Sequence, residues 1–87
     1  MIVYDWNEEK NHKLKKERNV SFEEVIVALE TGNLLDIIDN KKKYKNQRIF
    51  IVKIDYYAYL VPFEEKDETV FLKTIIPNKI ATKKYLL

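Results

Sequence analysis

The side chains that could do chemistry in this chain are basic and aromatic, and they lie mainly in its second half. Those that stand out are Arg48, Lys73, Lys79, Lys83, Lys84 and Tyr85, together with Lys43 and Lys45 in a Lys-rich run at 41–45. RNA can be cleaved without a metal ion where a phosphate is clamped, a base takes the 2′-hydroxyl proton and an acid protonates the leaving oxygen. Arg, Lys and Tyr can supply these functions where they are held together in a desolvated site.

These residues define a candidate catalytic site and a candidate RNA surface. We expect Arg48 and Lys79 to contact a scissile phosphate and Tyr85 to donate a proton. The supporting positive charge along the RNA would come from Lys73, Lys83, Lys84, Lys43 and Lys45.

The charge pattern is compatible with this hypothesis and also with a simpler one. Residues 1–40 hold five basic and nine acidic side chains, for a net charge of −4, whereas residues 41–87 hold eleven and five, for a net charge of +6. A face that binds phosphates produces such an asymmetry, and so does a well-solvated Lys-rich surface. The single histidine, His12, lies in a polar stretch and is interpreted as a surface residue.

Composition excludes several other classes of site. The chain has no Cys, which excludes disulfide scaffolds and thiolate metal sites, and its one His cannot build a zinc site without several carboxylates around it. It has no Gly-rich phosphate loop, nucleophile elbow or metal-ligand spacing, so we expect neither a metal nor a cofactor. No apolar run approaches the ~18 residues of a membrane span, and the first residues are too acidic for a signal peptide. We therefore expect a cytoplasmic protein that has no contact with membranes and forms one domain over residues 1–87.

Two helices are predicted in the first 32 residues. Residues 5–8 (DWNE) have the form of a capping box, so that Asp5 would cap a polar helix running to about Glu17. Asn19 tolerates the left-handed conformation and should end that helix. Residues 21–24 (SFEE) form a second box, in which Ser21 caps a helix that ends near Gly32, the only glycine.

After residue 34 the apolar pattern changes to a period of about two, which predicts strands at 34–39, 48–54, 57–63 and 69–76. Asp55-Tyr56 and residues 64–68 would form the turns, and such short links favour consecutive antiparallel strands. Pro62 should lie at a sheet edge or a strand end. Asn78 would cap a last helix through Tyr85. The sequence therefore predicts an α+β domain with two N-terminal helices, a four-stranded antiparallel sheet and a short C-terminal helix.

Four segments, in order along nearly the whole chain, carry motifs that occur together in one protein family. Residues 4–10 (YDWNEEK) match an opening made of an aromatic residue followed by Trp-Asp-x-x-Lys, and residues 17–24 (ERNVSFEE) match Lys-His-Gly-Val-Ser-Phe-Glu-Glu. Arg48 matches an Arg at the head of the second strand, and residues 74–82 (TIIPNKIAT) match the ending Arg-Ile-Ile-Ser-Ala-Arg-x-Ala-Thr. The chain thus resembles the BrnT toxins of the RelE/ParE superfamily, which belong to bacterial type II toxin–antitoxin modules.

The resemblance implies a RelE-like fold and a metal-independent endoribonuclease that cleaves mRNA, free or on the ribosome, and so arrests translation. It also implies a partner, a ribbon-helix-helix antitoxin, and we expect an acidic segment of that antitoxin to lie across the sheet and residues 79–84. Thr74 and Lys79 stand where the family has Arg, and Pro77 stands where it has Ser. Lys cannot form the two-pronged phosphate contact of Arg, so two such contacts are missing.

The alternative to an enzyme is a non-catalytic binding module. Such a module would be an inactive toxin relative that acts as corepressor with its antitoxin, or an inhibitor of another target such as a topoisomerase. Lys73 and Thr74 are expected on opposite faces of the strand at 69–76, so that only one of them could point into a given site.

Overall fold

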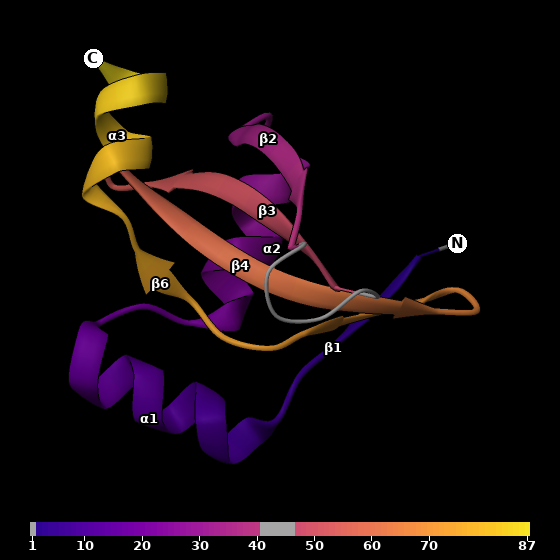
Figure 1. Ribbon diagram of the computed structural model, residues 1–87. Coiled ribbons are helices and arrows are strands. Elements are labelled where there is room, and N and C mark those ends of the chain that lie inside the picture. The colour runs from indigo at the N-terminus through magenta and orange to yellow at the C-terminus, as the bar shows by residue number, and fades with distance from the viewer. Residues whose placement is uncertain (1, 41–46) are drawn as a thin grey trace.

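The computed structural model describes residues 2–40 and 47–87 and confirms the α+β class (Figure 1). In chain order, its elements are β1 (Val3–Asp5), α1 (Glu8–Arg18), α2 (Phe22–Glu30), β2 (Leu34–Asp39), β3 (Gln47–Ile54), β4 (Tyr57–Lys66), β5 (Thr69–Leu72), β6 (Ile76–Pro77) and α3 (Lys79–Leu86). The run at 41–46, which includes the predicted RNA-binding residues Lys43 and Lys45, lies outside the described residues.

The sheet differs from the prediction in its strand number and in one strand direction. Its order is β1-β5-β4-β3-β2, with β6 paired to β4, so the described part forms six strands where four were predicted. β1 runs parallel to β5, with Val3 opposite Thr69, and the sheet is therefore mixed. The prediction missed β1 because residues 3–5 directly precede a helix, and only their pairing with a distant strand makes them part of the sheet.

The predicted strand at 34–39 is confirmed, and β3 and β4 contain the next two. Asp55 and Tyr56 both have positive φ (50° and 65°), as a tight hairpin turn requires, although neither is glycine. β4 is longer than predicted, because Glu64 and Glu65 continue the pairing with β5. The predicted strand at 69–76 is divided into β5 and β6 by residues 73–75.

Pro62 lies inside the central strand β4, which corrects the expectation of an edge or strand end. Its carbonyl oxygen accepts a hydrogen bond from the Lys73 N–H at 2.8 Å, so the backbone of Pro62 faces the interruption between β5 and β6. β3 pairs with β4 on one side of Pro62, but on the side of this interruption no ladder strand runs beside it, and the missing N–H of proline therefore leaves no ladder bond unmade there.

The residues that begin and end the first two helices are those that the sequence predicts, with one correction. The cap of α1 is Asn7, whose side chain accepts from the Lys10 N–H, and not Asp5, which belongs to β1. Asn19 ends the helix with φ 57°, as predicted. Ser21 caps α2 by accepting from the Glu24 N–H at 3.2 Å, and Gly32 follows with φ 79°.

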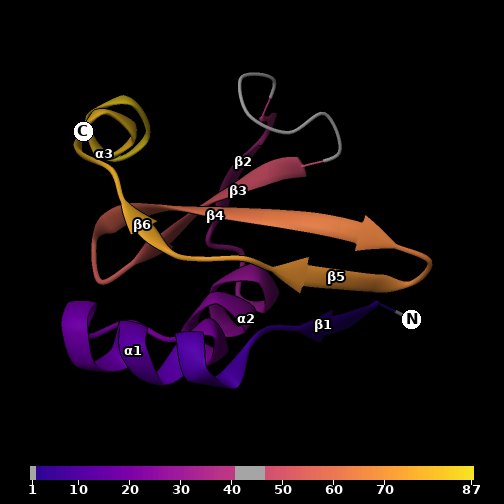
Figure 2. The same ribbon diagram turned by 60° about the horizontal axis from the view of Figure 1, so that its bottom comes forward.

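The two faces of the sheet are covered unequally. α1 and α2 lie on one side and α3 on the other (Figure 2). The larger core joins both N-terminal helices to the sheet through residues that include Leu14, Phe22, Val25, Phe50 and Phe63. The smaller core joins α3 to the opposite face through Ile51, Ala58 and Ala81, with Leu35, Leu60, Tyr85 and Leu86 packed around them.

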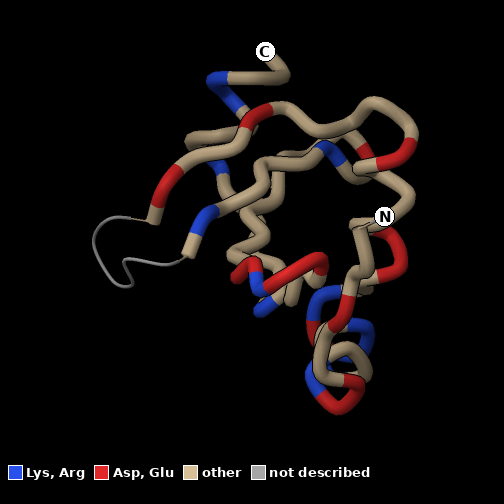
Figure 3. The backbone as a smooth tube through the Cα atoms, turned by 90° about the vertical axis from the view of Figure 1, so that its right-hand side faces the viewer, with Lys and Arg blue, Asp and Glu red and all other residues tan. Residues whose placement is uncertain are grey.

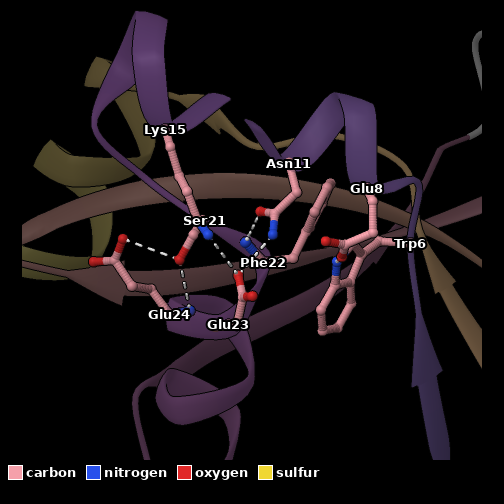
Figure 4. A network of polar contacts seen from close by, with 8 residues as sticks. All are labelled: Trp6, Glu8, Asn11, Lys15, Ser21, Phe22, Glu23 and Glu24. Atoms are coloured by element: carbon pink, nitrogen blue, oxygen red, sulfur yellow. Dashed lines mark hydrogen bonds and ion pairs between the residues drawn. The ribbon is translucent and has the colours of Figure 1, made fainter. Parts of the chain in front are cut away.

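A buried amide links the two N-terminal helices. Asn11 is completely buried, and its Oδ1 accepts from the Phe22 N–H at 2.8 Å, while its Nδ2 donates to Glu23 Oε1 at 2.7 Å (Figure 4). The hydrogen bond from Asn11 is the main reason why the pKa of Glu23 is lowered. One side chain of α1 thus satisfies the first N–H of α2 and fixes how the two helices meet.

Replacing Asn11 by Ala should therefore lower the free energy of unfolding by about 2 kcal/mol, because it leaves the buried N–H of Phe22 without an acceptor. Ser21→Ala is the matched comparison, since it removes an ordinary helix cap and should cost about 1 kcal/mol. Urea unfolding of both variants measures the difference. An Asn11→Ala loss no larger than that of Ser21→Ala would contradict the role given to the buried amide.

Candidate functional site

The face of the sheet that carries α3 is only partly covered and contains a groove. Strand alternation places Ile49, Ile51, Leu60 and Pro62 on this face, because Ile51 and Leu60 pack in the α3 cluster. The groove beyond α3 has a volume of about 630 Å³. Its lining comprises Asn40, Gln47, Ile49, Leu60, Pro62, Glu64, Lys73, Thr74 and Ile76.

The apolar surface in and beside the groove crosses four strands in two neighbouring rungs, and Ile38 lies beside the groove lining. Ile38 of β2 stands opposite Ile49 of β3, and Ile49 stands opposite Pro62 of β4. Leu60 of β4 stands opposite Ile76 of β6. Ile38 is 38% exposed and Ile76 is 39% exposed, although both are aliphatic side chains within strands. Apolar surface of this kind, bordered by polar residues, is typical of an interaction site.

Three hydrogen bonds attach helix α3 to the sheet, and the first is donated by the Asn78 N–H to the Ala58 carbonyl oxygen at 3.0 Å, just before the helix. Asn78 caps it by accepting from the Ala81 N–H at 2.7 Å. The Thr82 hydroxyl donates to the carbonyl oxygen of Asn78 and accepts from the N–H of Ala58, which belongs to β4. The third contact joins the far end of α3 to β2, where the Tyr85 hydroxyl donates to Asp36 Oδ2 at 2.6 Å.

The hydrogen bond to Asp36 limits the acid–base chemistry that is open to the Tyr85 hydroxyl. The hydrogen bond to Asp36 raises the pKa of Tyr85, with smaller contributions from burial and from the charge of Asp36. The pKa of Asp36 is lowered in turn, first by Tyr85, then by the Ile37 N–H, and also by the charge of Lys84. Because the proton of Tyr85 is already held by a carboxylate, a phosphate approaching this hydroxyl would meet a negative charge. The geometry thus opposes the predicted role of Tyr85 as proton donor.

Arg48 lies on the opposite face of the sheet from α3. It alternates with Phe50, which belongs to the core beneath α1 and α2. Its guanidinium is held by two carboxylates, with Nε 3.7 Å from Asp39 and Nη1 3.4 Å from Glu65. The structure therefore does not bring Arg48 together with Lys79 and Tyr85, and the predicted three-residue catalytic site is not formed.

The predicted RNA-binding lysines that the structure describes fall into two groups. Lys79, Lys83 and Lys84 are exposed on α3, and none has an ion pair among the described residues. Figure 3 shows the chain near the C-terminus carrying basic positions and no acidic ones. Lys73 is separate from this group, since its ammonium lies 3.4 Å from Glu64 Oε2 and over the ring of Phe71.

Lys73 and Thr74 both line the groove, which corrects the expectation that they face opposite sides. They follow the end of β5 at Leu72, so they belong to a connecting segment in which strand alternation does not hold. Thr74 thus borders the groove at the position where the resemblance placed an Arg in other proteins.

Sequence reasoning missed Asp36, Thr82 and Ile38, all of which shape this face. Asp36 stands between aliphatic residues, Leu35 and Ile37, in β2, and that placement was the available signal for it. Within the described residues, no helix is long and apolar enough to cross a membrane. The same residues contain no group of three or more His, Asp or Glu side chains that could hold a metal ion.

Tyr85→Phe should lower the melting temperature near neutral pH, because it removes the hydroxyl that joins α3 to Asp36. A carboxyl whose pKa is lower in the folded chain than in the unfolded chain stabilises the fold above the unfolded value, and this stabilisation is lost as the pH falls through the folded value. The difference between wild type and Tyr85→Phe should therefore shrink below about pH 4.

Tyr56→Phe is the control for this experiment, because Tyr56 is 83% exposed and its hydroxyl has no recorded partner in the described part of the chain. Thermal unfolding followed by circular dichroism at pH 7 and at pH 3 makes the comparison. A Tyr85→Phe difference that is the same at both pH values would argue against the Asp36 contact.

Comparison of the chain with known protein families, with curated proteins and with solved structures finds no match. The function of the protein has to be inferred from its residues and their geometry. The features available for that inference are one closed sheet face, one face with an apolar groove, and a basic helix beside the groove.

Proposed function

We propose that this protein is the toxin component of a two-protein toxin–antitoxin module, and that the open sheet face is the surface that binds its antitoxin. The observation that carries this proposal is the apolar surface formed by Ile38, Ile49, Pro62 and Ile76 beyond the α3 cluster, with Leu60 at the border between the two. Further support comes from the motifs that resemble BrnT toxins and from the α+β class. The RelE-like arrangement of the elements is part of the same proposal.

The chemistry of this surface specifies the partner segment. Apolar side chains of the partner would fill the groove over Leu60 and Pro62. Acidic side chains would meet α3, whose three lysines form no ion pair with a described carboxylate, although the charge of Lys84 acts on the nearby Asp36. An acidic segment with regularly spaced apolar residues, such as the C-terminal part of a ribbon-helix-helix antitoxin, fits both requirements. Opposite charges would also speed association and make it sensitive to salt.

The binding surface can be tested with one substitution at its rim. Ile76→Asp places a carboxylate in the groove, where it would lose hydration on binding and meet the acidic partner segment, so it should weaken binding of the purified antitoxin at least tenfold. Val27→Asp is the matched control, because Val27 is 59% exposed on α2, on the other side of the sheet. The antitoxin to be tested is the product of any short neighbouring reading frame that has a ribbon-helix-helix pattern, and the absence of such a frame would favour the non-catalytic module.

Calorimetry or surface plasmon resonance measures the affinity, and induced expression in a bacterial host measures growth arrest. Wild-type protein should arrest growth, and co-expression of the antitoxin should relieve the arrest. Equal affinities for the Ile76→Asp and Val27→Asp variants would remove the groove from the interface. Growth unaffected by the wild-type protein would contradict the toxin assignment.

Cleavage of mRNA is the second candidate for the activity of the toxin. The unpaired lysines of α3 favour it, because three ammonium groups on one short helix can hold a phosphate backbone. The position of Arg48 opposes the version of the mechanism expected from the sequence. A non-catalytic toxin that blocks its target by binding therefore agrees better with the positions of Arg48 and Tyr85.

Arg48→Ala tests whether Arg48 takes part in cleavage, and RNA assays of the wild-type protein distinguish cleavage from binding alone. Its guanidinium is already held by Asp39 and Glu65, so we expect growth arrest to be unchanged and any RNA cleavage to change by less than about twofold. Loss of a transition-state phosphate contact would instead lower cleavage by about a hundredfold. Lys79→Ala is the comparison on α3. Assays with purified protein on RNA, with and without ribosomes, provide the readout, and a hundredfold loss in Arg48→Ala would return Arg48 to the mechanism.

A further inference from the structure

Strand β2 forms one end of the sheet, and in the described part of the chain only β3 pairs with it. Just after β2, the Asn40 N–H donates to the Gln47 carbonyl oxygen of β3. In an antiparallel pair, the backbone groups of alternate residues face the partner strand. Those of Ile38 therefore face β3, whereas those of Ile37 and Asp39 face outward. The middle of β2 thus lies at an edge where a further strand could pair.

The side chains of this edge favour such pairing. Ile37 is 36% exposed and Ile38 is 38% exposed, and alternation places them on opposite faces of the sheet. Exposed aliphatic edge strands are common points of self-association. If two copies met antiparallel with Ile38 opposite Ile38, Ile37 would stand opposite Asp39 of the second copy, and no two aspartates would be opposed. In this register the Ile37 N–H has to donate to a carbonyl oxygen of the second copy.

The N–H that this pairing requires is already occupied. The Ile37 N–H donates to Oδ1 of Asp36, its neighbour in the strand, at 2.8 Å. Oδ2 of the same carboxylate accepts from the Tyr85 hydroxyl of α3 at 2.6 Å. Both hydrogen bonds lower the pKa of Asp36, first the one from Tyr85 and then the one from Ile37, so the group stays charged near neutral pH. A strand that paired here would have to displace a charged acceptor and remove part of its hydration, which is unfavourable.

The other end of the strand order carries the same arrangement. β1 pairs with β5, and the Val3 N–H donates to the carbonyl oxygen of Glu68. Alternation then turns the N–H of Trp6, directly after β1, away from β5. That N–H donates to Oδ1 of Asp5, again the preceding residue, at 2.8 Å. An aspartate thus occupies an outward-facing N–H at each end of the sheet.

We propose that Asp36 keeps β2 from pairing with the β2 edge of a second copy of this chain. One oxygen of its carboxylate occupies the N–H at the middle of the strand, and Tyr85 holds the other oxygen. A register shift between Leu34 and Asp36 disturbs the same edge. This inference is independent of the toxin proposal, because it concerns the edge of the sheet and neither the groove nor the lysines of α3.

Sedimentation velocity of the purified proteins at neutral pH tests the proposal. The wild-type protein should be monomeric, and Asp36→Ala should self-associate with a dissociation constant at least about tenfold lower. Asp39→Ala is the control for charge, since its carboxylate belongs to the same strand but lies against Arg48. Tyr85→Phe is the control for the attachment of α3, because it leaves the acceptor of the Ile37 N–H in place. Both controls should remain monomeric, and thermal unfolding establishes that each variant is folded at the assay temperature.

The double variant Asp36→Ala with Ile37→Pro locates the contact at the edge. Proline has no N–H, and an edge strand tolerates it where that N–H faces outward, so this variant should be monomeric again. Hydrogen exchange is a second readout, which decides the matter where the proline variant does not fold. The amides of residues 37 and 39 should exchange at least about tenfold more slowly in concentrated Asp36→Ala protein than in diluted protein.

Four results would overturn the proposal. They are a self-associated wild-type protein, a monomeric Asp36→Ala variant, a control that associates as strongly as Asp36→Ala, and self-association that leaves the exchange of the two amides unchanged. A folded double variant that still associates would place the contact away from the edge, and would overturn the proposal as well.

Discussion

The arrangement of the N-terminal half depends on the buried amide of Asn11. Helix α1 has few apolar residues, so hydrophobic contact alone does not fix its position against α2. Asn11 supplies the missing specificity, because its acceptor oxygen satisfies the first N–H of α2 and its donor nitrogen satisfies Glu23. A buried amide that is fully hydrogen-bonded favours one arrangement over others, since any shift leaves a polar group without a partner. With the helices fixed in this way, Leu14 and Phe22 enter the same core and close one face of the sheet.

Closing one face with two helices leaves the other face to a single short helix. α3 covers the end of the sheet near Ala58, where Ala81 is small enough to let the helix approach. It does not reach the row formed by Ile49 and Pro62, and the groove is the result. The interruption after Leu72 contributes to the same groove, because residues 73–75 leave the ladder and free the side of β4 at Pro62. Pro62 and the break between β5 and β6 thus occur together, because proline has no N–H to donate to a strand that would continue beside it.

The sequence predicts well where the controlling interaction is local. Ser21, Asn78 and Gly32 act within a few residues of their own positions, and their roles follow from side-chain acceptors and from a positive φ. β1 and β6 could not be predicted in this way, because each is short and gains its hydrogen bonds only from a distant strand. Asn11 could not be predicted either. An asparagine in a polar helix is usually exposed, and nothing near it in sequence indicates that Phe22 will lie beside it.

The candidate site could not be predicted for the same reason, since only the tertiary structure brings its residues together. Alternation along β3 relates Arg48 to Phe50, and a reader who assigns Phe50 to the core can place Arg48 on that face from sequence alone. Strand alternation does not predict on which face of the sheet α3 packs, because the chain between β4 and α3 could in principle return to either side. Only contacts such as that of Thr82 with Ala58 establish it. Once α3 lies opposite the N-terminal helices, a residue at the head of β3 that shares a face with Phe50 cannot share a site with Lys79, whatever the chemistry of the two side chains.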